Sequence, residues 1–492
     1  MRRFCLALSS ILLLACSAPD MFAGTFQKPM EFLTGNAPWA MAVGDFNNDG
    51  HPDLVTVDLL TTPGAVSVLL NNGDGTFQTH QDFPAGYLPY AVAVGDFNED
   101  GNADLAVVDE CYSMNGGGEC PADVAILLGN GDGTFQAYKV YATGHVSRSV
   151  VVADFNNDGK ADLLVGNWSS TNISILLGNG DGTFQGQVEY GLNYTVESVA
   201  SGDLNNDGAL DIVVPMGEGV LPGLNLGVLL NNGDGTFQPA VYYQSTVGQY
   251  SGSYAVAIAD MNHDGNADLV VGNDGGVDAR SFNSASVLLG NGDGTFRPYR
   301  AFHSLMYAHS IALGDFNNDG TPDVVLGDNL YSGLTSIGVG VLLGKADGTL
   351  EVNREFAAGW HPTPVVVADF NGDGAPDIAA GDYSTKPAVG VLLNAGGTFV
   401  STASSSNPSK FGQPVTFTTT VMASVGSGRL PTGSVVFKDG TSTLGSAVLA
   451  NGQASLTTSS LSLGAHTINA HYSGSEAFNR NAAPAITQDV TP

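Results

Sequence analysis

The chain has 492 residues and carries 16 Lys and Arg against 48 Asp and Glu, a formal net charge of −32. This acidity argues against nucleic acid or an anionic membrane surface as a partner, because phosphate contacts need a basic face. Charged residues are only 13% of the chain while hydrophobic residues are 43%, a balance that excludes an acidic disordered chain. The 65 glycines predict many tight turns between short strands.

The N-terminus has the pattern of an export signal. Arg2 and Arg3 precede an apolar stretch over residues 4–15, which is too short to span a bilayer. We expect a signal peptide over residues 1–23, cleaved after Ala23. The alternative is a lipoprotein signal, in which Leu13-Leu14-Ala15 precedes Cys16 as the lipid-anchored N-terminus. No later segment has 18 consecutive apolar residues, so no transmembrane span is expected.

The next feature along the chain is a nonapeptide of the form D-x-N-x-D-G-x-x-D, which occurs seven times at intervals of 49 to 58 residues. A second motif, LLGNGDGTF or a variant of it, follows each copy. Each unit predicts four short strands: an apolar strand before the nonapeptide, a second after it, a third ending in the NGDG turn, and an outer strand opened by TFQ. Seven such units of about 54 residues match a β-propeller in period and number.

The segment Gly24-Thr25-Phe26-Gln27 repeats the start of an outer strand before the first complete unit. We expect it to supply the outer strand of the last blade, which closes the ring and removes its free sheet edges. The predicted propeller covers residues 24–399. Its two cysteines, Cys111 and Cys120, bracket a short Gly-rich insertion and are expected to form a local disulfide in an oxidising compartment.

Each nonapeptide clusters hard oxygen donors in a tight loop. Positions 1, 3, 5 and 9 carry Asp, Asn, Asp and Asp, glycine at 6 allows the sharp turn, and position 7 offers its main-chain carbonyl, which suits Ca²⁺. The alternative is a set of Asx-turns without metal, but three carboxylates in an empty loop would repel one another. The expected structural calcium ligands are Asp45, Asn47, Asp49, His51, Asp53, Asp96, Asn98, Asp100, Asn102, Asp104, Asp154, Asn156, Asp158, Lys160, Asp162, Asp203, Asn205, Asp207, Ala209, Asp211, Asp260, Asn262, Asp264, Asn266, Asp268, Asp315, Asn317, Asp319, Thr321, Asp323, Asp369, Asn371, Asp373, Ala375 and Asp377, with His51, Asn102, Lys160, Ala209, Asn266, Thr321 and Ala375 acting through the carbonyl.

With their flanking strands, these nonapeptides resemble the FG-GAP or VCBS-type repeats of bacterial surface proteins, which are similar in turn to the propeller of integrin α chains. The resemblance covers roughly residues 24–399. It implies a seven-bladed propeller with Ca²⁺ in the loop between the first two strands of a blade. It does not imply a single activity, because such propellers serve adhesion, glycan binding and, in some lineages, polysaccharide cleavage.

A ligand site is expected on the face opposite the calcium loops, where the units differ. The residues six places before each first Asp are Trp39, Tyr90, Arg148, Glu197, Tyr254, His309 and Thr363. Aromatic rings with a few polar groups can stack sugars or anchor a protein. The alternative is that each ring caps the core of its own blade. The candidate ligand residues are Trp39, Tyr87, Tyr90, His145, Arg148, Tyr254, His309 and Trp360.

No catalytic residues are predicted, because the chain shows no nucleophile elbow, zinc signature or phosphate-binding Gly motif. We therefore expect an exported, calcium-binding adhesion or ligand-binding protein, secreted or at the cell surface, with an extracellular glycan or a surface protein as partner. The alternative function is a polysaccharide-degrading lyase or hydrolase on the same propeller.

The C-terminal part lacks the nonapeptide. Residues 400–410 are rich in Ser, Thr, Asn and Pro and predict a linker. Residues 411–492 hold about six strand candidates separated by turn signals, which predicts a β-sandwich. The stretch from Gly433 to Gly474 resembles a bacterial Ig-like repeat of exported proteins. The expected fold is therefore all-β, a seven-bladed β-propeller followed by an Ig-like β-sandwich.

Overall fold

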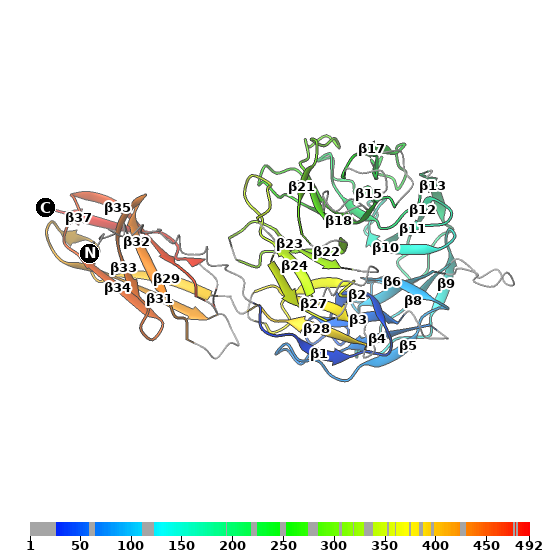
Figure 1. Ribbon diagram of the computed structural model, residues 1–492, viewed down its shortest axis with the longest axis horizontal. Coiled ribbons are helices and arrows are strands. Elements are labelled where there is room, and N and C mark those ends of the chain that lie inside the picture. Colours follow the sequence, from blue (N-terminus) through cyan, green and yellow to red (C-terminus); the bar gives the residue numbers. More distant parts are fainter. Residues whose placement is uncertain are drawn as a thin grey trace, which may run out of the picture.

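The computed structural model describes residues 26–492 except 59–63, 111–122, 193, 218–223, 247–251, 274–283, 305–307, 318, 329–337, 352–353, 360, 373–374, 383–386, 395–397, 424–429, 476–477 and 479–480. These residues form strands, turns and bends, and none of them lies in a helix. Accordingly, the described part of the chain contains no helix that could cross a membrane. The strands build a ring of sheets and a smaller sandwich (Figure 1).

In the part of the chain that the structure describes, the larger body has seven four-stranded antiparallel sheets. Six of them follow the chain order from the inner to the outer strand, and the seventh takes its outer strand from the N-terminal end of the chain. The sheets are β2 (Pro38–Gly44), β3 (Asp53–Asp58), β4 (Ala65–Leu69) and β5 (Gln81–Pro84); β6 (Pro89–Gly95), β7 (Asp104–Asp109), β8 (Asp123–Leu127) and β9 (Lys139–Ala142); β10 (Ser147–Ala153), β11 (Asp162–Asn167), β12 (Asn172–Leu176) and β13 (Val188–Gly191); β14 (Ala200–Gly202), β15 (Asp211–Pro215), β16 (Leu226–Leu229) and β17 (Val241–Tyr243); β18 (Ser253–Ala259), β19 (Asp268–Asn273), β20 (Ala285–Leu288) and β21 (Arg300–Phe302); β22 (Ala308–Gly314), β23 (Asp323–Asp328), β24 (Gly338–Leu342) and β25 (Arg354–Ala357); and β26 (Val365–Ala368), β27 (Asp377–Asp382) and β28 (Ala388–Leu392) with β1 (Met30–Leu33). The expected β-propeller is confirmed.

Burial differs among the four strands of a sheet in a way that explains their sequences. The second and third strands, such as β7 and β8, are buried along their whole length. Both of their faces pack against neighbouring sheets, so their sequences are continuous apolar runs. The first strands, such as β6, are only partly buried, because they line the axis of the ring. The fourth strands are mostly exposed, as in β9.

The N-terminal strand closes the ring as expected. β1 pairs with β28, from Met30 opposite Val391 to Leu33 opposite Ala388. Phe26 forms an isolated bridge with Asn394 and packs edge-on against Phe316 and Phe356 of the neighbouring sheet. The first strands contact one another around the whole circle, from β2 to β26 and back to β2. The pairing of β1 with β28 joins residues separated by most of the propeller sequence, so β28 is not left as a free sheet edge.

The NGDG turns join neighbouring sheets. The amide of Gly133 in the second sheet donates to the carbonyl of Phe46 in the first loop at 2.8 Å, and Gly182 repeats this contact with Phe97. The positive φ of Gly133, 83°, is one that a side chain would strain. Asp132 accepts hydrogen bonds from the amide and hydroxyl of Thr134, and these bonds stabilise the turn. In four of the described turns, the hydrogen bond from the glycine amide attaches the turn to the nonapeptide loop of the preceding sheet.

The C-terminal body is a β-sandwich with a core around Phe417, Phe437 and Tyr472. One sheet has three strands and the other has six, with β36 paired to β35 beside the main path. The strands are β29 (Thr398–Ser404), β31 (Val415–Ala423) and β34 (Gln453–Thr458) in the first sheet, and β30 (Ser409–Lys410), β37 (Ile486–Thr491), β35 (Gly464–Tyr472), β32 (Ser434–Asp439), β33 (Ser442–Val448) and β36 (Asn481–Ala482) in the second.

The linker predicted over residues 400–410 is wrong. β29 pairs with β31 over seven residues, and β30 pairs with β37. The Ser and Thr side chains that suggested a linker lie on a half-exposed strand, where Thr402 hydrogen-bonds Thr419 across the ladder at 2.8 Å. Composition alone therefore misplaced the start of the sandwich, which already includes β29.

His466 predicts a pH dependence for the sandwich. Its Nδ1 lies 2.6 Å from Asp439 Oδ2 and its Nε2 lies 2.9 Å from the carbonyl of Ser462. These acceptors, the Ser462 carbonyl first, raise the pKa of His466. Because the folded pKa lies above the unfolded value of about 6.5, the stabilisation is complete at lower pH and is lost as the pH rises through the folded value.

We expect hydrogen exchange in β35 of the full chain to accelerate between about pH 6 and pH 8, beyond the intrinsic pH dependence of exchange. The variant His466→Gln should abolish this change. The variant His471→Gln, at an exposed position of the same strand, should retain it. Equal pH dependence in all three proteins would contradict the role of His466.

Candidate ligand cavity and calcium loops

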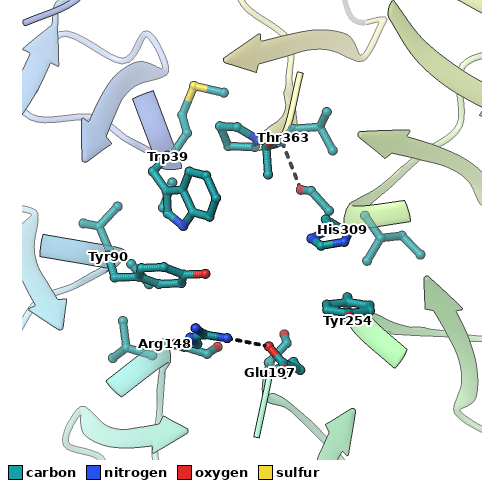
Figure 2. A pocket seen from close by; sticks show the side chains of 18 residues that line it. Trp39, Tyr90, Arg148, Glu197, Tyr254, His309 and Thr363 are labelled. Atoms are coloured by element: carbon teal, nitrogen blue, oxygen red, sulfur yellow. Dashed lines mark hydrogen bonds and ion pairs between the residues drawn. The ribbon is translucent and has the colours of Figure 1, made fainter. Parts of the chain in front are cut away.

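The side chains that differ between repeats meet on the axis of the ring. Figure 2 shows the residues six places before each nonapeptide converging from the first strands and the segments before them. They line one cavity of about 430 Å³, a size within the range of about 300–1,000 Å³ typical of ligand pockets. The seven residues are Trp39, Tyr90, Arg148, Glu197, Tyr254, His309 and Thr363.

A local irregularity of the backbone directs five of these side chains inward. The pairing of β2 with β3 skips Trp39, because Pro38 pairs with Asp58 and Ala40 with Val57. The same shift leaves Tyr90 and Arg148 outside the ladder. It recurs at Tyr254 and His309. An extra residue of this kind is a β-bulge, which re-aims a side chain and is common beside functional sites.

A cluster of three charged side chains, Arg148, Glu110 and Glu197, lies at one side of the cavity and is called the clamp below. Arg148 donates from Nε and Nη2 to Glu110 Oε1 at 2.9 and 2.7 Å, and from Nη1 to Glu197 Oε2 at 3.0 Å. The indole of Trp168 lies 4.3 Å from the guanidinium carbon, and its Nε1 donates to the other oxygen of Glu197 at 2.9 Å. The ring of Tyr90 is also close, at 5.5 Å. These contacts hold Arg148 in a single position.

Aromatic pairs form the other walls. The rings of Trp39 and Tyr90 lie 5.4 Å apart with their planes inclined by 57°. Tyr254 and His309 are stacked at 4.1 Å with an angle of 15°. In Figure 2 the hydroxyl end of Tyr90 points toward the middle of the cavity. The cavity thus combines rigid ring surfaces with fixed polar groups.

Burial shifts the pKa values of three titratable side chains that line the cavity: Tyr90, His309 and Glu197. It raises the pKa of Tyr90 to about 12, against the opposing effect of Arg148. Burial lowers the pKa of His309 to about 4, and the charge of Arg148 acts in the same direction. Burial also raises the pKa of Glu197, although Arg148 and Trp168 oppose the shift. At neutral pH the tyrosine and the histidine are therefore uncharged, and the clamp supplies the charges of the cavity.

On the opposite face, the nonapeptide loops fold their side chains over their own backbone. In the first loop, Asp45 accepts from the amides of Asp49 and Gly50, and Asn47 accepts from that of Asp49. Asp49 accepts from the amide of His51. Gly50 has a φ of 84°, which is why position 6 is glycine. The second to sixth loops repeat the bonds of Asp45 with the same geometry.

The ninth residue of each loop is a buried aspartate. The two oxygens of Asp53 accept from the amides of Phe46 and Asn71 at 2.9 and 2.7 Å, and its side chain is fully buried. Burial raises its pKa to about 6, the two amides oppose this shift, and Asp49 and Asp45 raise the pKa further. The loop therefore concentrates carboxylates whose mutual repulsion a cation would relieve.

Whether the loops suit a cation depends on the oxygens that remain available. A carboxylate oxygen with one hydrogen bond keeps a second lone pair, so the all-oxygen donor set fits Ca²⁺. The described residues nevertheless contain no group of three or more His, Cys, Asp or Glu side chains already gathered around one metal position. In the seventh loop, Asp373 lies outside the described residues.

The other predicted ligand residues do not all reach the cavity. Trp39, Tyr90, Arg148, Tyr254 and His309 line it, whereas Tyr87 and His145 do not. Trp360, Cys111, Cys120 and the signal segment with Cys16 and Ala23 lie outside the described residues. Sequence reasoning missed Glu110 and Trp168, which hold Arg148. They follow the second strands of their sheets, and no motif distinguishes them.

Comparisons with known proteins agree with this architecture. A model of the FG-GAP-like repeat matches residues 57–107, 110–165, 154–214, 223–271 and 273–326, which together exceed half of the chain, and an FG-GAP repeat model matches residues 37–69. A bacterial Ig-like domain (group 3) matches residues 401–491. No curated protein matches the chain.

Two solved structures match the chain with low sequence identity and low TM-scores. One is the extracellular domain of a protein described as a hybrid two-component system from B. thetaiotaomicron, with 9% identity and a TM-score of 0.42; the match covers 95% of this chain and 59% of that chain. The other is the periplasmic gluconolactonase of Pseudomonas aeruginosa, with 14% identity and a TM-score of 0.38, covering 64% of this chain and 95% of that one.

Proposed function

The chain belongs to the FG-GAP repeat family and carries a bacterial Ig-like domain, and on this premise we propose that it is an exported binding protein whose ligand is a glycan held in the central cavity. The observation that carries the proposal is the convergence of seven different side chains, from equivalent positions of the repeats, into one cavity. Repeats that served only to build the ring would have no need to differ there.

The chemistry of the cavity favours a glycan over other ligands. Sugars present apolar C–H faces and hydroxyl edges, which match the ring pairs Trp39–Tyr90 and Tyr254–His309 and the fixed polar groups of Arg148 and Glu197. The cavity is concave and small, whereas a protein partner usually needs a broader surface. A surface protein as ligand is therefore an outcome for the experiment to detect.

Binding without turnover is part of the proposal. Both oxygens of Glu197 are engaged, by Arg148 and by Trp168, and Glu110 is bound to the same guanidinium. A general acid or base must be free to exchange a proton with the substrate. The carboxylates of this cavity instead hold Arg148 in place, which supports a binding role.

We further propose that calcium stabilises the ring and that the protein is exported. The donor set of the loops and the repulsion among Asp45, Asp49 and Asp53 support the calcium role, with about seven ions as the number of loops suggests. The N-terminal signal pattern supports export to the cell surface or the medium. The Ig-like domain then serves as a spacer or a second binding module.

A glycan array probed with the mature protein in the presence of calcium tests the binding function. We expect saturable binding to at least one glycan class, reduced at least about fivefold by Trp39→Ala, because a stacking ring contributes about 1 kcal/mol or more. The control is Tyr87→Ala, which removes an aromatic ring that is 57% exposed and lies outside the cavity.

Two results would contradict the proposal. Binding that survives Trp39→Ala unchanged would place the site elsewhere, and release of cleaved product from any glycan would show an enzyme. If no glycan binds while a surface protein is captured and Trp39→Ala abolishes the capture, the cavity serves a protein ligand instead.

A further inference from the structure

The cluster of Arg148, Glu110 and Glu197 at the side of the cavity contains one guanidinium and two carboxylates, an excess of one negative charge. One guanidinium lies between two carboxylates, with contacts of 2.7 Å to Glu110 and 3.0 Å to Glu197. Of the other titratable residues that line the cavity, His309 and Tyr90 are neutral at pH 7. Arg148 and Glu197 line the cavity, whereas Glu110 contacts Arg148 from outside the lining, so the cluster of these three side chains has a formal net charge of −1.

Arg148 is poorly placed to bind an acidic sugar. Three of its five N–H groups already donate to Glu110 and Glu197, and its faces are near the rings of Trp168 and Tyr90. A fork-like contact with a ligand carboxylate would require the guanidinium to leave these partners. Breaking the clamp would leave Glu197 buried without its cation, which is strongly unfavourable.

We propose that the central cavity selects uncharged saccharides and rejects uronic acids, with Glu110 and Glu197 as the specificity-determining residues. This inference rests on the proposed function, glycan binding in the cavity. The ring pairs provide stacking surfaces for either kind of sugar, whereas only a neutral one avoids repulsion by the excess carboxylate. The two glutamates thus position Arg148 and also set the sign of the local potential.

The experiment compares pairs of saccharides in which the hydroxymethyl group of the neutral sugar is replaced by a carboxylate. The probes are hexamers of mannose, galactose and glucose, each titrated beside the corresponding hexuronate in calcium-containing buffer of low ionic strength. We expect the neutral member of a bound pair to bind at least about tenfold more tightly, the effect of one unit charge at roughly 10 Å in a partly buried site. Added salt should reduce the ratio of the two affinities, because it screens the repulsion between the charges.

The double variant Glu110→Gln/Glu197→Gln keeps amide oxygens that accept from Arg148 and changes the local charge from −1 to +1. We expect it to reverse or abolish the preference for the neutral member. The matched control, Glu31→Gln/Glu351→Gln, removes the same charge at exposed positions outside the cavity and should leave the ratio unchanged. Melting curves of both variants check that they are folded.

The possible results distinguish a failure of the selectivity for neutral saccharides from a failure of glycan binding in the cavity. Uronates bound as tightly as neutral hexamers, with loss of both on Trp39→Ala, would overturn the selectivity and leave glycan binding intact. An unchanged ratio in the cavity double variant would also overturn it. If none of the six hexamers binds, then glycan binding and its selectivity are both overturned for these sugars.

Discussion

Removal of calcium with EDTA is expected to lower the melting temperature of the propeller by at least about 10 °C. A site occupied at about 100 times its dissociation constant stabilises the native state by about 2.7 kcal/mol, and about 1 kcal/mol shifts the melting temperature of a large domain by roughly 2 °C. Two sites would therefore suffice for the shift. All three tryptophans precede residue 398, so tryptophan fluorescence reports on the propeller.

Single-loop variants test whether the nonapeptides bind the ions. Asp100→Ala removes a carboxylate from the second loop and should reduce the bound calcium by one ion per chain. Asp132→Ala removes an equally exposed carboxylate from the adjacent NGDG turn, where it accepts from Thr134, and should leave the calcium content unchanged. A protein free of calcium that melts at the same temperature as the loaded one would instead support metal-free Asx-turns.

Opening the ring is expected to have the second large effect. Deletion of residues 26–33 removes β1 and leaves β28 as an unpaired edge next to exposed core side chains. We expect the propeller to lose cooperative unfolding and to associate in a concentration-dependent way, because a long apolar edge is a template for pairing with other chains. Light scattering and melting curves measure both consequences.

A milder substitution keeps this prediction testable if the deleted protein does not fold. Phe32 packs edge-on against Phe77 at 5.2 Å, whereas Leu33 in the same strand is 65% exposed. Phe32→Ala should lower the free energy of unfolding by about 3 kcal/mol, and Leu33→Ala by less than about 0.5 kcal/mol. Equal effects of the two substitutions would show that β1 does not hold the ring closed.

The repeat made most of the propeller predictable. The nonapeptide and the NGDG turn each recur at one place in the unit, and together they indicated the four strands, the loops and the closing strand before the first unit. Turn residues with positive φ leave a strong signal, because few residues other than glycine adopt that conformation. The position six places before each loop marks seven residues that line the cavity, although the predicted ligand residues omitted Glu197 and Thr363 and included Tyr87 and His145, which do not line it.

The parts that could not be predicted depend on contacts between distant residues. Glu110 and Trp168 hold Arg148 across neighbouring sheets, and their local sequences resemble those of other strand ends. Likewise most of β29 falls in the segment predicted as a linker, because its Ser and Thr residues gain their partners only when β31 lies beside it. Local sequence does not show which distant strand supplies those partners.

The most direct test of glycan binding in the central cavity is a crystal structure of the protein with calcium and the glycan from the array that binds most tightly. We expect electron density for a sugar in the central cavity, stacked on Trp39 or Tyr254, with the contacts from Arg148 to Glu110 and Glu197 intact. A sugar bound between the outer strands or on the Ig-like domain, with an empty central cavity, would contradict it.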